Sequence, residues 1–429
     1  MDKQTYQAYI SLLKEELVPA LGCTEPIAIA YAAAKCREVL GALPDKLKIG
    51  CSGNIIKNVQ GVTVPNSGGL KGIAVAATLG CIGGNSSNVL EVLKDVTDEH
   101  RALTKELVEN NFCDCYLIDN CNNLFIKIEA FYKNDSAEVN ITNTHTNISK
   151  IVKNGEILFE ADNCQDVAMN EVDQYFKYLN IKSIVEFADS VDLNDVKEIL
   201  EEEIEFNSAI SQEGLTNDWG LGVGQTIRKY YDKKDVRIKA ISAAAAGSDA
   251  RMGGCSMPVI INSGSGNQGL TISLPIIEYA RHFDFSKERL LRALTLGNLI
   301  SIQEKSSIGS LSAYCGAVCA GTAAGCGIAY LFGGKEEEIS NVITNCLANI
   351  GGIVCDGAKP SCAAKIATSV QAGILSFEMG MKENKAFKKG EGLIKSTADK
   401  TIKSFGRVGK LGMKSTDTEI LSIMLEPND

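Results

Sequence analysis

Three cysteines in the C-terminal third of the chain have the types and spacing for metal chemistry. Cys315 lies in the segment AYCGAVCAG, and Cys355 and Cys362 lie seven positions apart in GGIVCDGAKPSCAAK. Glycines and Pro360 mark the second segment as a loop whose backbone N–H groups can point toward sulfur. Three thiolates from two segments suit an iron–sulfur cluster in which one iron has no protein ligand. Such an iron can act as a Lewis acid.

Other cysteines compete for this role. Cys319 lies one helical turn after Cys315, and with Cys326 it remains an alternative first ligand. A denser group at the edge of a predicted sheet has no histidine partner: Cys113, Cys115 and Cys121. Zinc is the rival metal, but it usually binds paired cysteines about two to four residues apart. We expect a further set to be small buried side chains: Cys36, Cys81, Cys164, Cys326 and Cys346.

Cys23 is a candidate catalytic thiol. It precedes a predicted helix in LGCTEP, where Thr24 suits the N-cap and Pro26 an early helical position. The positive end of a helix dipole favours a thiolate and lowers a cysteine pKa. A thiolate there can take a proton as a base, or it can be the resting-state ligand of the open iron. The residues leave both roles open.

Glycine-rich motifs supply candidate substrate contacts. SGSGNQG at 263–269 follows the strand-like MPVIIN and precedes an apolar helical segment. A glycine loop at a helix start presents N–H groups that suit a carboxylate, and the motif is not a dinucleotide-binding fingerprint. The motifs at 52–54 and 66–69 have the same character, with Asn54 the expected contact.

Three further side chains have chemistry to consider. Arg251 in SDARMGG can bind a carboxylate through two parallel hydrogen bonds. His145 in NTHTNI falls on the predicted sheet, where we expect a surface histidine. Asp356 follows Cys355 directly and is placed to orient that loop. No lysine lies in a setting that indicates pyridoxal phosphate.

The elements that position these residues predict an α+β fold. For residues 1–88, the sequence predicts helices and glycine-rich turns that contribute to the active site. Residues 89–206 predict a smaller domain whose alternating segments form an antiparallel sheet, followed by helices that include DVAMNEVDQYFKYL at 166–179. Residues 207–429 predict a large, mainly helical catalytic domain with tightly packed Gly/Ala-rich helices.

Composition limits the class of protein. The net charge of −10 leaves no basic stripe for nucleic acid. No long apolar run predicts a membrane span. The N-terminal residues lack the pattern of a signal peptide, and fifteen cysteines, an odd number, cannot all pair within one chain. We therefore expect a cytoplasmic protein with free thiols.

Together, GGIVCDGAKPSC, SGSGNQG, LGCTEP and SGNIIKN resemble the L-cysteine desulfidase family. That family is related to the alpha region of iron–sulfur L-serine dehydratases, and the likeness covers nearly the whole chain. It implies a [4Fe-4S] cluster on the three cysteines described first, and a functional Cys23. SGSGNQG is similar to the Asn-Gly-Ala-Ala-Gly loop of serine dehydratases, which implies that Ser265 and Asn267 bind the carboxylate or ammonium of an amino acid.

The resemblance implies a lyase that converts L-cysteine to pyruvate, ammonia and hydrogen sulfide. The same cluster chemistry on L-serine is the nearest alternative, although the seven-position spacing of Cys355 and Cys362 differs from the longer loop of serine dehydratases. A non-catalytic iron–sulfur sensor is the alternative from another class. We expect a homodimer that binds a small amino acid and neither nucleic acid nor membrane.

Overall fold

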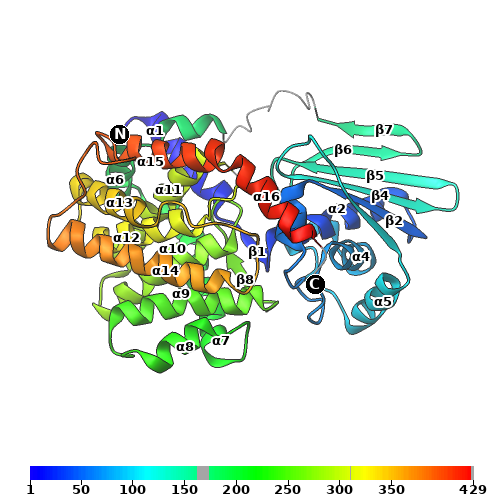
Figure 1. Ribbon diagram of the computed structural model, residues 1–429, viewed down its shortest axis with the longest axis horizontal. Coiled ribbons are helices and arrows are strands. Elements are labelled where there is room, and N and C mark those ends of the chain that lie inside the picture. Colours follow the sequence, from blue (N-terminus) through cyan, green and yellow to red (C-terminus); the bar gives the residue numbers. More distant parts are fainter. Residues whose placement is uncertain (162–172, 310, 427–429) are drawn as a thin grey trace.

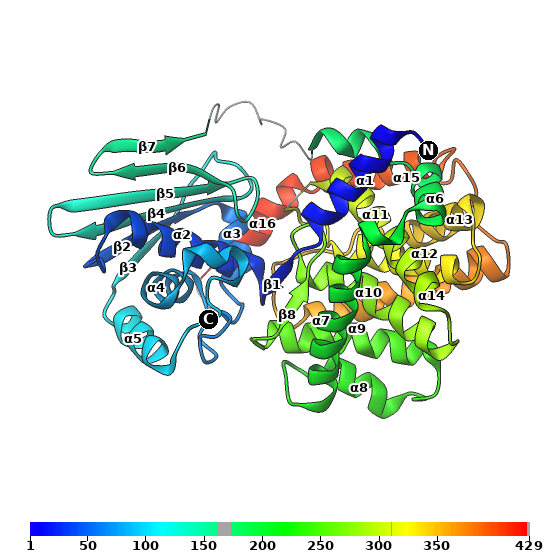
Figure 2. The same cartoon turned by 180° about the vertical axis from the view of Figure 1, so that it is seen from behind.

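The computed structural model describes residues 1–161, 173–309 and 311–426, which form a sheet-containing lobe and a helical lobe (Figures 1 and 2). The α+β class is confirmed. Cys164 and the first part of the predicted helix at 166–179 lie outside the described residues. The described part of that predicted helix contains the short 3₁₀ segment η2 (Asp173–Tyr178).

The smaller lobe is built on a six-stranded sheet of order β3-β2-β4-β5-β6-β7. Its strands are β2 (Lys46–Cys51), β3 (Cys113–Leu117), β4 (Phe125–Tyr132), β5 (Asp135–Thr142), β6 (Ile148–Lys153) and β7 (Glu156–Glu160). The predicted sheet was antiparallel, but β2 and β3 pair in parallel. A parallel pair needs a long crossover, and the segment between the two strands supplies it.

Helices cover one face of this sheet. They are α2 (Thr24–Leu40), α3 (Gly53–Val59), α4 (Ile73–Gly83) and α5 (Asp98–Glu109), with the 3₁₀ segment η1 (Ser86–Glu91). α2 packs on α4, β4 and β5 through an Ala-rich surface. Gly41 ends α2 in a left-handed conformation (φ 84°), which glycine adopts without strain.

The core of the helical lobe is formed by Gly/Ala-rich helices. Its helices are α1 (Lys3–Glu16), α6 (Ile181–Ser190), α7 (Lys197–Thr216), α8 (Val223–Tyr230), α9 (Val236–Met252), α10 (Gly266–His282), α11 (Lys287–Ile308), α12 (Ala317–Leu331), α13 (Glu336–Ile350), α14 (Cys362–Phe377) and α15 (Ala398–Arg407). Short helical segments add η3 (Leu193–Asp195), η4 (Glu378–Lys382) and η5 (Val408–Gly412). A Cβ on Gly321 would lie 2.4 Å from the Ser369 carbonyl oxygen, so glycine permits the contact of α12 with α14.

Two features join the lobes. β1 (Pro19–Leu21) pairs antiparallel with β8 (Pro258–Ile260), and α16 (Lys414–Leu425) extends from the helical lobe to α3 (Figure 2). The predicted domain boundaries near residues 88 and 206 stay predictions; the packing places α1 and α7 with helices of the large lobe, and β2 in the sheet of the small one.

Candidate active site

A short antiparallel bridge brings Cys315 and Cys355 together. The Cys315 N–H donates to the Ile353 carbonyl (2.9 Å), and the Cys355 N–H donates to the Ala313 carbonyl (2.7 Å). Tyr314 pairs with Val354 between them. Cys315 and Cys355 lie across this bridge on one face, and their thiols share a hydrogen bond. Two residues forty positions apart thus become neighbours.

The two thiols differ in pKa, and Cys355 is the one that favours the thiolate. The hydrogen bond from Cys315 lowers the pKa of Cys355 to about 6, and the Gly357 N–H and the charges of Lys57 and Lys365 act in the same direction against burial. The same hydrogen bond and burial raise the pKa of Cys315. Thiolate is the form that binds metal.

Asp356 organises the loop that carries Cys355. Its carboxylate pairs with Lys359 (3.0 Å) and with Lys365, which also donates to the Val354 carbonyl. Burial raises the pKa of Asp356, but the two lysines outweigh this and lower it to about 2. These contacts agree with the predicted orienting role.

Cys362 opens α14 and lies near the two other cysteines. Burial raises its pKa, and the neighbouring Cys355 raises it further, while Arg251 lowers it. Cys362 and Ala358 pack against a small apolar cluster formed by Cys23, Val62 and Met252. The structure therefore brings Cys23 of the sheet lobe close to Cys362 of the helical lobe.

The three cysteines suit an iron–sulfur cluster because of the chemistry of their thiol donors. Within the described ranges, no three or more His, Cys, Asp or Glu side chains have the geometry to hold a metal ion. The thiols of Cys315, Cys355 and Cys362 nevertheless lie close to one another. The pKa of the Cys355 thiol is lowered, and Lys57 and Lys365 contribute to this. That donor set is the kind that an iron–sulfur cluster uses.

Cys23 is a buried thiol that acts as a hydrogen-bond donor. It occupies the N-cap position of α2, where Thr24 was expected. Its Sγ donates to Glu25 Oε2 (3.0 Å). Burial and the Glu25 carboxylate raise its pKa. The expectation that the helix terminus favours the thiolate is wrong for this geometry, because desolvation and a neighbouring negative charge outweigh the dipole.

The SGSGNQG motif forms a tight turn before α10, as predicted. Asn262 and Ser265 exchange backbone hydrogen bonds of 3.1 and 3.0 Å, and Ser263 and Gly264 have φ of 50° and 76°. Thr24 Oγ1 donates to the Gly264 carbonyl (2.9 Å), which ties the turn to α2. A Cβ on Gly266 would lie 2.4 Å from Arg251 Nε, so glycine admits the guanidinium.

Five buried polar atoms around this turn have no hydrogen-bond partner among the described residues: Asn58 Oδ1, His145 Nε2, Arg251 Nε, Asn267 Oδ1 and Gln268 Oε1. Folded proteins rarely leave such atoms unpaired. One guanidinium donor and three amide oxygen acceptors complement a zwitterion, whose carboxylate accepts and whose ammonium donates. The turn therefore has the polar groups for an amino acid.

Asn54 lies elsewhere. It lines a separate cavity of about 200 Å³ between the 117–123 loop and α16. One turn further along α3, Asn58 Nδ2 donates to Glu25 Oε1 (2.9 Å) instead. In the 66–69 motif, Asn66 donates to the Leu93 carbonyl and Ser67 to the Leu70 carbonyl, so these side chains stabilise a turn.

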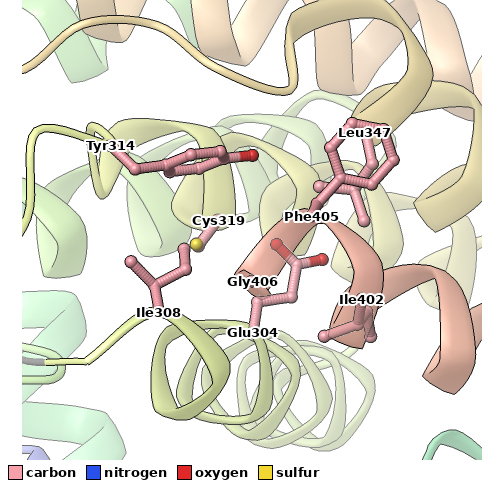
Figure 3. A pocket seen from close by; sticks show the side chains of 8 residues that line it. All are labelled: Glu304, Ile308, Tyr314, Cys319, Leu347, Ile402, Phe405 and Gly406. Atoms are coloured by element: carbon pink, nitrogen blue, oxygen red, sulfur yellow. The ribbon is translucent and has the colours of Figure 1, made fainter. Parts of the chain in front are cut away.

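The competing cysteines have other surroundings. Cys319 and Cys326 are buried in α12, and Cys319 lines a small cavity with Glu304 and Tyr314 (Figure 3). The Cys113 thiol contacts Thr78 Oγ1 (3.1 Å). Cys121 bonds the Ile118 carbonyl, and Cys115 is exposed. Their separate contacts favour structural roles.

Sequence reasoning missed Glu25 and Asn58, and it misplaced His145. His145 was expected on the surface, but its ring lies against Gly264, where a Cβ would be 3.2 Å from Cε1. Burial, Arg251 and Lys305 lower its pKa, while Glu25 opposes them. The position of Glu25 within LGCTEP was the one available signal.

Comparison with known proteins identifies relatives over nearly the full length. A family described as serine dehydratase alpha chain matches residues 87–422. The UPF0597 protein of Lachnoclostridium phytofermentans is 50% identical, covering 98% of this chain and all of that protein. The UPF0597 protein of Treponema denticola is 45% identical, covering 99% of each. No helix in the described part of the chain is long and apolar enough to span a bilayer.

Proposed function

This chain belongs to the serine dehydratase alpha chain family, and we propose that it is an iron–sulfur-dependent lyase that eliminates hydrogen sulfide from L-cysteine. Family membership supports a lyase. The observation that carries the proposal is the convergence of Cys315, Cys355 and Cys362 beside a turn whose unpartnered polar atoms complement an amino acid.

The three cysteines would hold a [4Fe-4S] cluster. When bound, the cluster supplies a Lewis acid at the iron that lacks a protein ligand. Lys57 and Lys365 lie near Cys355 and offset the negative charge of cysteine thiolates.

The protein binds and orients the substrate. Arg251 and the N–H groups at the start of α10 bind the carboxylate. The amide oxygens of Asn267 and Gln268 accept hydrogen bonds from the ammonium, and Ser265 lies at the N-cap position beside them. Cys23, whose S–H donates to the Glu25 carboxylate, takes the Cα proton as Glu25 accepts the thiol proton. The resulting aminoacrylate becomes an imine, which water converts to pyruvate and ammonia.

L-Serine is the second candidate substrate, because the matching family is described by that activity. A hydroxyl and a thiol differ by one atom, so the carboxylate and ammonium contacts serve both. The seven-position spacing of Cys355 and Cys362, typical of the desulfidase resemblance, favours L-cysteine. We also propose that the protein is cytoplasmic and forms a homodimer. Light scattering on the purified protein would test the homodimer.

The test begins with anaerobic purification, followed by assays of sulfide and pyruvate from L-cysteine and L-serine. We expect a brown chromophore and faster turnover of L-cysteine. Cys355→Ala should lose both, whereas the matched buried control Cys326→Ala should keep both. Full chromophore in Cys355→Ala would contradict the ligand assignment. Faster turnover of L-serine would favour the dehydratase, and turnover of neither would favour a sensor.

A further inference from the structure

Glu25 is a buried carboxylate held by three neutral donors. Its side chain lies in the first turn of α2 and is 8% exposed. Oε2 accepts from Cys23 Sγ (3.0 Å) and from Thr24 Oγ1 (3.2 Å), and Oε1 accepts from Asn58 Nδ2 (2.9 Å). Burying a carboxylate without an ion pair is costly, so this position needs an explanation beyond packing.

The surroundings keep Glu25 ionised and Cys23 protonated. Burial raises the pKa of Glu25, but His145, the hydrogen bond from Cys23 and Arg251 outweigh it and lower the pKa. Burial and Glu25 raise the pKa of Cys23. Because Cys23 Sγ is the donor in its hydrogen bond to Glu25 Oε2 (3.0 Å), the geometry directs the thiol proton at a carboxylate oxygen that can accept it.

We propose that Glu25 is the terminal proton acceptor of the elimination and acts through the thiol of Cys23. This inference rests on the proposed function. The Cα proton moves to the Cys23 sulfur while the Cys23 S–H proton moves to Glu25 Oε2. The electron pair of the Cα–H bond forms the Cα–Cβ double bond, and the Cβ–S bond breaks, with its pair leaving on hydrosulfide. Glu25 then returns its proton to solvent.

The hydrogen bonds around Glu25 suit this task. Asn58 fixes one oxygen and leaves the other directed at Cys23. The single proton of the Thr24 hydroxyl is shared between Glu25 Oε2 (3.2 Å) and the Gly264 carbonyl (2.9 Å). The proton acceptor is therefore tied to the turn that binds the substrate carboxylate, which fixes the distance between base and Cα.

The experiment compares Glu25→Gln with Glu25→Asp in the cluster-loaded enzyme. Gln keeps the size and the acceptor oxygen but cannot take a proton. We expect Glu25→Gln to lower kcat by on the order of 10²- to 10⁴-fold, with little change in KM, in cluster absorbance or in circular dichroism. Glu25→Asp keeps a carboxylate and should retain more activity than Glu25→Gln. L-cysteine deuterated at Cα should show a full primary isotope effect on kcat in Glu25→Gln.

Three outcomes would overturn the proposal: wild-type kcat in Glu25→Gln, more activity in Glu25→Gln than in Glu25→Asp, or slow turnover in Glu25→Gln without an isotope effect. Asn58→Ala is the matched control, because it removes a contact to Glu25 but leaves the carboxylate; it should lower kcat less than Glu25→Gln does. Failure of the proposed function is distinguishable, because the wild-type protein itself would then turn over neither amino acid.

Discussion

Asn267 illustrates what a single residue contributes and how far its role was predictable. The glycine-rich motif predicted a turn before a helix, and the turn is present because Ser263 and Gly264 adopt positive φ. The partners of the turn were not predictable, since His145 arrives from the β5–β6 connection and Arg251 from the end of α9. Local patterns report local conformation, whereas a polar pocket depends on contacts between distant segments.

Replacing Asn267 by Ala should weaken substrate binding. The change removes an unpartnered buried oxygen at the turn and, with it, a hydrogen bond to the charged ammonium. Such a bond contributes roughly 1.5–3 kcal/mol, which corresponds to about a ten- to hundredfold loss in kcat/KM. Steady-state kinetics on L-cysteine measures this loss.

Substrate analogues show whether Asn267 binds the ammonium or the carboxylate of L-cysteine. Cysteamine lacks the carboxylate, and 3-mercaptopropionate lacks the ammonium. If Asn267 binds the ammonium, the substitution should weaken inhibition by cysteamine and leave inhibition by 3-mercaptopropionate unchanged. The reverse pattern would assign Asn267 to the carboxylate.

At the scale of elements, α16 supports the cysteine bridge from outside. Asp417 on α16 pairs with Lys57 of α3 (2.5 Å), whose side chain is 2% exposed, and accepts from the Ala313 N–H (3.0 Å). Ala313 is the residue whose carbonyl binds the Cys355 N–H. The sequence did not indicate this contact, because nothing local signals an ion pair between residues 360 positions apart.

Asp417→Ala should destabilise the protein and its metal site. Removing one partner of a buried ion pair costs about 3–5 kcal/mol, and the Ala313 N–H loses its acceptor. We expect a lower Tm and less iron retained per chain after gel filtration. Glu419→Ala, at an exposed position of the same helix, is the control and should change neither. An unchanged iron content in Asp417→Ala would show that α16 does not support the bridge.

At the scale of the whole molecule, the site exists only because two lobes meet. Cys23, Glu25 and Asn58 come from elements of the sheet lobe, and Arg251, Cys355 and Cys362 from the helical lobe. Hydrophobic periodicity predicted most helices and strands, since each buries one face. It did not predict the parallel pairing of β2 with β3 or the strand pair β1–β8, because pairing between distant strands leaves little trace in local sequence.

At the same scale, the contribution of Glu203 to the stability of the molecule should fall as pH rises from about 4.5 to about 8. Glu203 is fully buried in α7 and accepts hydrogen bonds from Asn298 Nδ2 at 3.2 and 3.0 Å. Burial raises its pKa from 4.5 to about 8. The folded state therefore binds a proton that the unfolded state releases in this range, so the contribution is fully present below pH 4.5 and is lost as pH approaches 8.

Glu203→Gln should remove the share of this pH dependence that Glu203 contributes, while Asp249 and Glu304, whose pKa values burial also raises, keep their shares. One group shifted in this way changes the free energy of unfolding by at most about 1.4 kcal/mol per pH unit, or roughly 3 kcal/mol between pH 4.5 and 7. Urea titrations at several pH values measure the slope of the free energy of unfolding against pH. Burying the uncharged amide of Glu203→Gln costs the same at every pH, so that cost does not change the slope. Glu205→Gln, at an exposed position on the same helix, should keep the wild-type slope. Equal slopes in wild type and Glu203→Gln would mean that Glu203 does not hold its proton in the folded protein, and that the Asn298 hydrogen bonds suffice to stabilise a buried carboxylate.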